Sequence, residues 1–282
     1  MRRTAVEVWR LLTTAYRGFA RDSGGVTAGA IAFFSILALV PISLLAFTVF
    51  ARLLGSEAHR QFESAVQQLL PGGSGEVLKA IAAYSRSPKP LVNLVGMLAL
   101  LWSGTSLLAL LSQILTTIWI GRRARGYLAQ RLVGLLALLA GGLLFLVNML
   151  VAGLIAAARA HEDRLGPLAV YLHAIHFLGS VLPFFLSAAS AAVGFFLLYR
   201  FLPDGRVSTR AAALATLPAA LLWLVSRSLF SVLVAGSSYY GQVYGPLTGA
   251  MVLLLWIYYT AYIMIFCAEL GVAAQGRTTS TP

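Results

Sequence analysis

Arg227 and Glu269 are ionisable side chains inside long apolar stretches, so they are the first candidates for chemistry. Arg227 stands in the fifth such stretch of the chain, and Glu269 stands near the end of the sixth. A charge within a membrane span is expensive, and it is kept there by a partner or by a function. Glu269 can have a functional role, or it can reach the interface or pair with basic residues. The arginines available for such pairing are Arg131, Arg200 and Arg210.

The guanidinium of Arg227 also has two interpretations. It can hold a phosphate or carboxylate in a cavity, because its planar fork of donors matches either anion. It can instead snorkel outward and satisfy backbone carbonyls. With a rise of about 1.5 Å per residue, Arg227 and Glu269 are separated by roughly 20 Å of depth. They are therefore not expected to be direct partners.

Aromatic and polar residues extend this candidate site. The segment Ser237–Pro246 places three tyrosines and two glycines at the predicted outer interface. Trp256 falls nearer to mid-span, which favours packing against other helices or a cavity. Polar side chains in spans most often bond between helices, although they can also line a polar path. The predicted substrate-binding residues are Arg227, Glu269, Trp256, Tyr244, Tyr240, Ser35 and Trp102.

Enzymatic chemistry is not expected of this chain. Eight of the nine carboxylates lie outside the apolar stretches, and the one cysteine, Cys267, lies in an apolar run. The chain has no HExxH zinc motif, no GxSxG elbow and no GxxxxGKS/T phosphate loop. His173 and His176 can share a helix face, but this spacing alone is unspecific for metal. We predict no catalytic residues, no metal site and no cofactor.

The composition identifies the elements that must position these residues. Of 282 residues, 59% are hydrophobic and 11% are charged, whereas an ordinary soluble domain has about 25% charged residues. With a mean hydropathy of +0.84, this indicates an all-α integral membrane protein. Six stretches have the roughly 20 apolar residues that a transmembrane helix needs. They are Val26–Leu54, Leu91–Ile120, Leu132–Ala158, Phe177–Tyr199, Ala211–Ala235 and Leu247–Ala274.

Basic residues determine the predicted orientation of this six-helix bundle. They gather before the first stretch and after the second and fourth, whereas the opposite loops hold fewer. Because Lys and Arg collect in cytoplasmic loops, both termini are predicted to be cytoplasmic. The net charge of +12 has the same explanation, so nucleic-acid binding is not expected.

Three segments complete the predicted domain organisation. Residues 1–25 carry an amphipathic helix over residues 2–21, whose arginines lie opposite an apolar face, as in helices of the cytoplasmic interface. Residues 26–274 form the transmembrane domain, which includes an outer helical hairpin at residues 55–90 that is either a lid or simple packing. Residues 275–282 are predicted to be a disordered cytoplasmic tail.

Short segments along nearly the whole chain have a familiar order and spacing. They are Ala28–Pro41, Leu101–Ser103, Tyr199–Pro203, Tyr244–Leu247, Leu255–Tyr258 and Ala268–Leu270. Together they resemble the YihY/BrkB family of bacterial inner-membrane proteins, once mislabelled ribonuclease BN. The family often has a tyrosine pair where this chain has Phe33 and Phe34. The resemblance implies six membrane helices and a carrier or envelope-maintenance group, with lipid or lipopolysaccharide handling suggested for some members.

We therefore expect a multi-pass inner-membrane protein, transporter-like, that handles an amphipathic or lipidic, anionic substrate in envelope maintenance. Membrane lipids are its expected partners, and a second copy of the chain or an envelope protein are further candidates. The alternative is a non-transporting membrane scaffold of an envelope complex. In that case the N-terminal helix and the outer hairpin would be docking surfaces.

Overall fold

The computed structural model describes residues 2–38, 90–121, 126–160, 172–205, 207–236 and 248–275, and all regular secondary structure in these ranges is helical. The helices are α1 (Arg2–Arg21), α5 (Pro90–Ile120), α6 (Tyr127–Ala160), α7 (Leu172–Phe201), α8 (Thr209–Gly236) and α10 (Thr248–Ala274). A further apolar helix, Gly24–Ala38, follows α1. Residues 55–89 of the predicted outer hairpin and 276–282 of the predicted tail lie outside the described ranges, as do Tyr240 and Tyr244.

Five of these helices are long and apolar enough to cross a membrane. The apolar segments are Trp102–Ile120, Leu128–Asn148, Phe184–Phe201, Thr209–Val232 and Thr248–Ala274. They fall on the second to sixth predicted stretches, which confirms an all-helical chain with several candidate spans. Of the first predicted stretch, Val26–Leu54, the structure describes the part up to Ala38. The helix α8 continues through Pro218, so this proline does not end the span.

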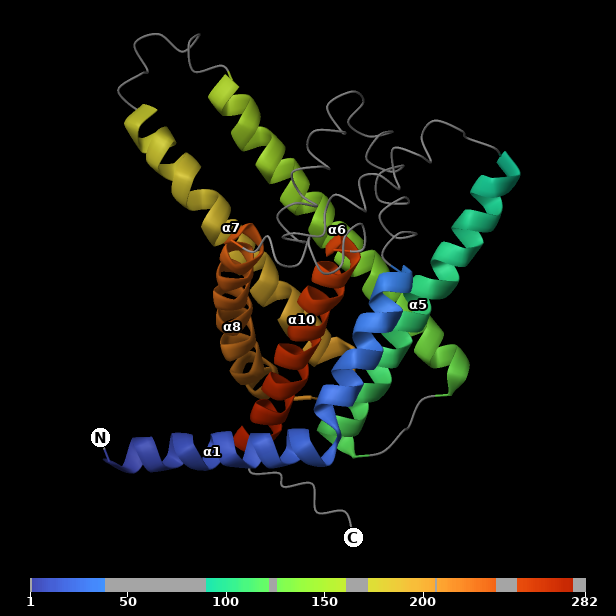
Figure 1. The fold of residues 1–282 in the computed structure, drawn as a ribbon, viewed down its shortest axis with the longest axis vertical. Coiled ribbons are helices and arrows are strands. Elements are labelled where there is room, and N and C mark those ends of the chain that lie inside the picture. Colours follow the sequence, from blue (N-terminus) through green and yellow to red (C-terminus); the bar gives the residue numbers. More distant parts are fainter. Residues whose placement is uncertain are drawn as a thin grey trace.

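The helix α10 lies in the middle of the bundle (Figure 1). It packs against α8, α5 and α1, while α6 packs against α5, and α7 packs against both α8 and α6. The helix α1 lies across one end of the bundle, next to the C-terminal end of α10 (Figure 1). Residues near either end of the chain are therefore brought together at this end of the molecule.

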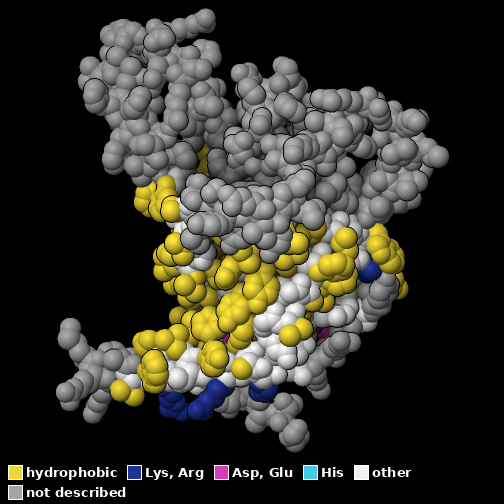
Figure 2. Space-filling view, viewed as in Figure 1, with side chains coloured by type: hydrophobic (Ala, Val, Ile, Leu, Met, Phe, Trp, Pro, Cys, Tyr) yellow, Lys and Arg dark blue, Asp and Glu magenta, His cyan; other side chains and the backbone are white. Residues whose placement is uncertain are grey.

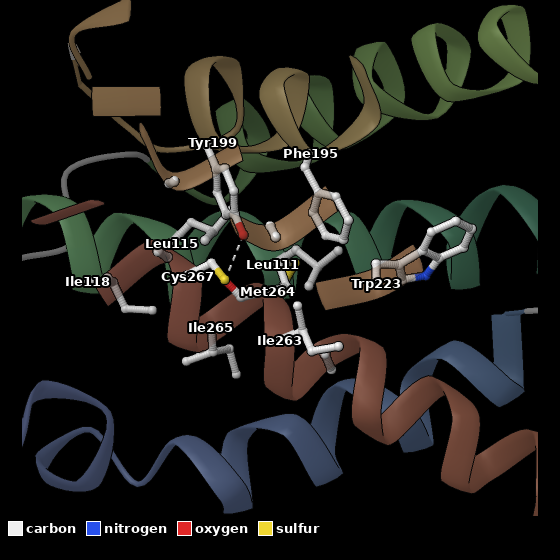
Figure 3. Packing of buried hydrophobic residues seen from close by; sticks show 14 of the residues in the cluster. Leu111, Leu115, Ile118, Phe195, Tyr199, Trp223, Ile263, Met264, Ile265 and Cys267 are labelled. Atoms are coloured by element: carbon white, nitrogen blue, oxygen red, sulfur yellow. Dashed lines mark hydrogen bonds between the residues drawn. The ribbon is translucent and has the colours of Figure 1, made fainter. Parts of the chain in front are cut away.

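A buried core runs along α10 and fixes the connection between α7 and α8. The hydroxyl of the fully buried Tyr199 donates a hydrogen bond to the carbonyl of Met264 at 2.9 Å (Figure 3). Ser112 Oγ donates to the carbonyl of Leu202 at 2.7 Å. These bonds tie the segment Tyr199–Pro203 to both α5 and α10. The segment therefore helps to hold α5, α7 and α10 together.

The outward faces of the helices are apolar. On α6 and α8 the exposed leucines and valines recur every three or four residues, so they share one helix face. They are Leu128, Leu132, Leu136, Leu139 and Leu143 on α6, and Leu214, Leu217, Leu221, Val225, Leu229 and Val232 on α8. Hydrophobic side chains also dominate the described surface in Figure 2. Such faces suit contact with lipid chains, where helices satisfy their own backbone groups.

Candidate functional site

The first candidate site, the Arg227 cluster, consists of Arg227, Ser187, Trp223, Trp256 and Phe230. Arg227 Nη1 donates a hydrogen bond to Ser187 Oγ on α7. The guanidinium carbon lies 5.8 Å from the ring centroid of Trp223. Trp223, Arg227 and Phe230 stand at i, i+4 and i+7 on α8, so a single helix face presents all three.

Trp256 connects this face of α8 to the central helix. Its ring centroid lies 6.0 Å from that of Trp223 and 5.2 Å from that of Phe230. The side chain of Trp256 is only 3% exposed, and the other two rings are also buried. The structure therefore brings together Arg227 and Trp256, two of the predicted site residues, through Trp223.

Arg227 is a half-buried cation without a carboxylate partner in the part of the chain that the structure describes. The one ion pair within 4.0 Å among those residues joins Arg21 to Asp22. The single hydrogen bond from Arg227 to Ser187 uses one of the five N–H donors that a guanidinium carries. The chemistry that this arrangement offers is therefore the binding of an anion that approaches the exposed side of Arg227.

The second candidate site, the Glu269 junction, consists of Glu269, Gly18, Arg21 and Asp22. Glu269 is 5% exposed and faces α1 from the last turns of α10. A Cβ added at Gly18 would collide with Glu269 Oε2, so the carboxyl group occupies the space that a side chain at this position would fill. Phe19 reinforces the contact, because its ring centroid lies 4.4 Å from that of Tyr262.

Charged groups of the turn after α1 surround this carboxyl group. Asp22 lies one turn after Gly18, and its backbone N–H donates to the carbonyl of Gly18 at 2.9 Å, so Asp22 stands close to the point where Glu269 touches α1. Arg21 Nε donates to Asp22 Oδ1 at 2.9 Å, and this bond raises the pKa of Arg21. Glu269 Oε1 is buried and has no hydrogen-bond partner among the described residues. Glu269 therefore does not make the predicted alternative contact with Arg131, Arg200 or Arg210, but packs on α1.

Arg131 and Trp102 form a separate contact between α5 and α6. The predicted third span begins after Arg131, but α6 begins at Tyr127, so this arginine lies inside the helix. Its guanidinium carbon sits 4.4 Å from the ring centroid of Trp102, which is 64% exposed. Its Nη1 donates to Thr105 Oγ1 at 3.1 Å and to Ser106 Oγ at 2.6 Å.

Arg131 can contact these residues of α5 because α5 and α6 cross closely at this point. A Cβ at Gly134 would lie 2.9 Å from the carbonyl oxygen of Thr105, so the two backbones nearly touch there. Sequence spacing could not show this crossing, which is why Arg131 was not predicted as a site residue.

The remaining predicted residues do not join the Arg227 cluster. Ser35 is half-buried on the helix Gly24–Ala38. Glu269 and Trp102 belong to the two other contacts described above. Sequence analysis missed Ser187, Trp223 and Phe230; of these, Trp223 could have been found from its position four residues before Arg227, on the same helix face.

An all-helical chain with several helices apolar enough to cross a bilayer, and with charged side chains set between them, defines a multi-pass membrane protein. The model of the virulence factor BrkB family matches residues 15–282. The chain belongs to this family.

Curated relatives are membrane proteins as well. A UPF0761 membrane protein of Pseudoalteromonas atlantica is 25% identical over 253 residues, covering 89% of this chain and 81% of that protein. A UPF0761 membrane protein of Ralstonia nicotianae is 28% identical over 264 residues, covering 91% of this chain but only 57% of that protein. The corresponding Azotobacter vinelandii protein is 27% identical over 281 residues, covering 99% of this chain and 66% of that protein. No solved structure gives a significant match.

Proposed function

We propose that this chain is a transporter-like protein of the bacterial inner membrane that handles an amphipathic or lipidic, anionic substrate in envelope maintenance. The observation that carries the proposal is the half-buried guanidinium of Arg227, which has no carboxylate partner among the described residues. An unpaired cation within a membrane span is costly. A phosphate or carboxylate of a substrate would offset that cost, because either group accepts two parallel bonds from a guanidinium.

The surroundings of Arg227 support a lipidic substrate over a small soluble anion. Phe184 lies one turn before Ser187 on the same face of α7, and its apolar ring is exposed. Trp223 and Ser187 supply an aromatic face and a hydroxyl beside the guanidinium. A headgroup held at Arg227 would therefore have an exposed apolar side chain of α7 close by for its acyl chains.

The proposed topology has six transmembrane helices with both termini in the cytoplasm. The helix Gly24–Ala38 would begin the first span, and α1 would lie in the cytoplasmic interface. In support, Val8, Trp9, Leu12 and Tyr16 of α1 are exposed and apolar. Figure 2 shows hydrophobic side chains along one side of α1 and basic side chains along the other. Interfacial helices have this division, with basic groups toward anionic headgroups.

Lipid movement in reconstituted vesicles tests the proposed function. Vesicles that contain the protein and a fluorescent anionic phospholipid should equilibrate the label between leaflets faster than protein-free vesicles. Arg227→Ala should reduce this rate to that of empty vesicles, whereas Arg227→Lys should retain part of it, because Lys keeps the charge but not the fork. The control is Arg10→Ala, an exposed arginine on α1.

Two results would contradict the proposal. If Arg227→Ala moves lipid as fast as the wild type, Arg227 does not hold the headgroup. If the folded wild-type protein moves no lipid, the transporter interpretation is wrong. Co-purification of one stoichiometric envelope protein would then favour the scaffold.

A further inference from the structure

The Glu269 junction has a charge arrangement that the Arg227 cluster does not explain. Two carboxyl groups come together here, because Glu269 touches α1 at Gly18 and Asp22 lies one turn after Gly18. One cation, Arg21, is paired with Asp22. With both carboxyl groups ionised, the junction would carry one uncompensated negative charge. With one proton shared between them, the pair carries a single charge that Arg21 balances.

Burial makes the uncompensated state expensive at this position. Glu269 is 5% exposed, and its Oε1 has no hydrogen-bond partner among the described residues. A buried carboxylate without partners loses its hydration and gains little in return, and a neighbouring like charge adds to the cost. A proton on the pair removes both penalties, because the protonated group becomes a hydrogen-bond donor to the other carboxylate.

The charged groups around Glu269 come only from the α1 side, as far as the structure describes them. Arg21 and Asp22 are the ionisable groups that act on it. The elements packed on the other side of α10 bring Trp119 of α5 and Ala215 of α8 against Gly271, and neither of these side chains titrates. Among the described residues, Arg21 is the one cation within 4.0 Å of either carboxyl group.

We propose that Asp22 and Glu269 form a proton-binding carboxyl pair at the junction of α1 and α10, and that this pair is the coupling-ion site of the transport proposed above. The proton adds to one carboxylate oxygen and is shared with the other carboxyl group. A bound metal ion fits less well, because no group of three or more His, Cys, Asp or Glu that could hold one occurs among the described residues. The coupling role rests on the proposed function, whereas the proton site itself rests on the geometry of the junction.

The helix α10 provides the physical connection between the two sites. It carries Glu269 at the α1 junction and Trp256 in the Arg227 cluster, and both side chains are buried. A shift of α10 against α1 would therefore also move Trp256, which packs on Trp223 beside Arg227.

Infrared spectroscopy of the full chain in lipid nanodiscs tests the proton site without any transport measurement. The wild-type protein should show the carbonyl stretch of a protonated carboxyl group at neutral pH, where exposed carboxylates are ionised. Glu269→Gln should abolish this band, and Asp22→Asn should reduce it, because the like charge is gone. Glu7→Gln, which removes an exposed carboxylate of α1, should leave the band unchanged.

The outcome in the wild-type protein alone decides the proposal, even if a variant fails to fold. Absence of the band at neutral pH would overturn it, as would a band that persists in folded Glu269→Gln. Loss of the band when sodium is added at constant pH would overturn it in favour of a metal cation.

A second measurement separates this proposal from the proposed function. A pH gradient across the vesicles should accelerate lipid movement by the wild type but not by Glu269→Gln. If the band is present and Arg227→Ala has no effect on lipid, the proton site stands and the coupled transport falls. If lipid moves through Arg227 and the band is absent, the proposed function stands and the proton site falls.

Discussion

The Arg227 cluster and the Glu269 junction place opposite charges in opposite kinds of surroundings. Arg227 is half-buried beside the ring of Trp223 on α8, and the exposed ring of Phe184 lies one turn before its partner Ser187 on α7. Glu269 is almost fully buried, pressed against Gly18 of α1. The cation is partly open to a molecule from outside the protein, whereas the carboxyl group is enclosed by its neighbours.

This contrast explains how one bundle can hold the side chains of Arg227 and Glu269 in different ways. Packing around Glu269 depends on the absence of a side chain at Gly18, so the carboxyl group has little space to move. Packing around Arg227 depends on one hydrogen bond and on an aromatic ring 5.8 Å away, which leaves several donors available. We infer that the junction is a closely packed site with room for a proton and that the cluster is an open site.

The largest expected effect on stability comes from removing the ring of Trp256, which belongs to the Arg227 cluster and lies on the same helix as Glu269. Trp256→Ala should lower the free energy of unfolding by about 3–5 kcal/mol, because it leaves a cavity between Trp223 and Phe230. Thermal unfolding in detergent measures this loss. The control is Trp9→Ala on α1, where the side chain is 70% exposed, and its effect should stay within about 0.5 kcal/mol.

A smaller loss of stability is expected from a substitution at the Glu269 junction. Gly18→Ala places a methyl group where Glu269 Oε2 lies, and it should lower the free energy of unfolding by about 1–3 kcal/mol. Gly29→Ala has nothing within 4 Å of the added Cβ. It should be neutral or stabilise by up to about 1 kcal/mol through helix propensity. Equal melting temperatures for the two variants would show that the junction is not tightly packed.

The smallest effect is expected on lipid binding at the Arg227 cluster. Ser187→Ala removes the hydroxyl that accepts the bond from Arg227. The guanidinium then orients less well, and anionic lipid should be held about fivefold more weakly, for a hydrogen bond worth about 1 kcal/mol. Lipid retention after detergent washing measures this. Ser231→Ala is the control, since this exposed serine bonds only to the carbonyl of Ser228 among the described residues. If both variants retain lipid equally, Ser187 does not help to position Arg227.

The sequence predicted the helices well, because apolar composition sets the length of a membrane span. The predicted stretch Leu91–Ile120 differs by one residue from α5, which is Pro90–Ile120. The amphipathic pattern over residues 2–21 also matches the extent of α1. Periodicity is a local property, so it can be read without knowledge of the tertiary structure.

The contacts between the sites could not be read in the same way. Asp22 and Glu269 are almost at opposite ends of the chain, and their contact depends on α1 lying across the end of α10. Arg131 lies just outside the predicted stretch Leu132–Ala158, although the close approach of Gly134 to α5 brings it to Trp102. These contacts follow from how helices cross, for which a single sequence carries no signal.

Native mass spectrometry of detergent-purified protein with its co-purified lipids tests the central claim most directly. The wild type, Arg227→Ala and Glu269→Gln would be compared under identical conditions. We expect the wild type to retain one anionic lipid selectively, Arg227→Ala to lose it by about tenfold or more, since charge-assisted bonds are the stronger ones, and Glu269→Gln to keep it. Equal retention by the wild type and Arg227→Ala, or equal loss in both variants, would contradict the division of roles between the two sites.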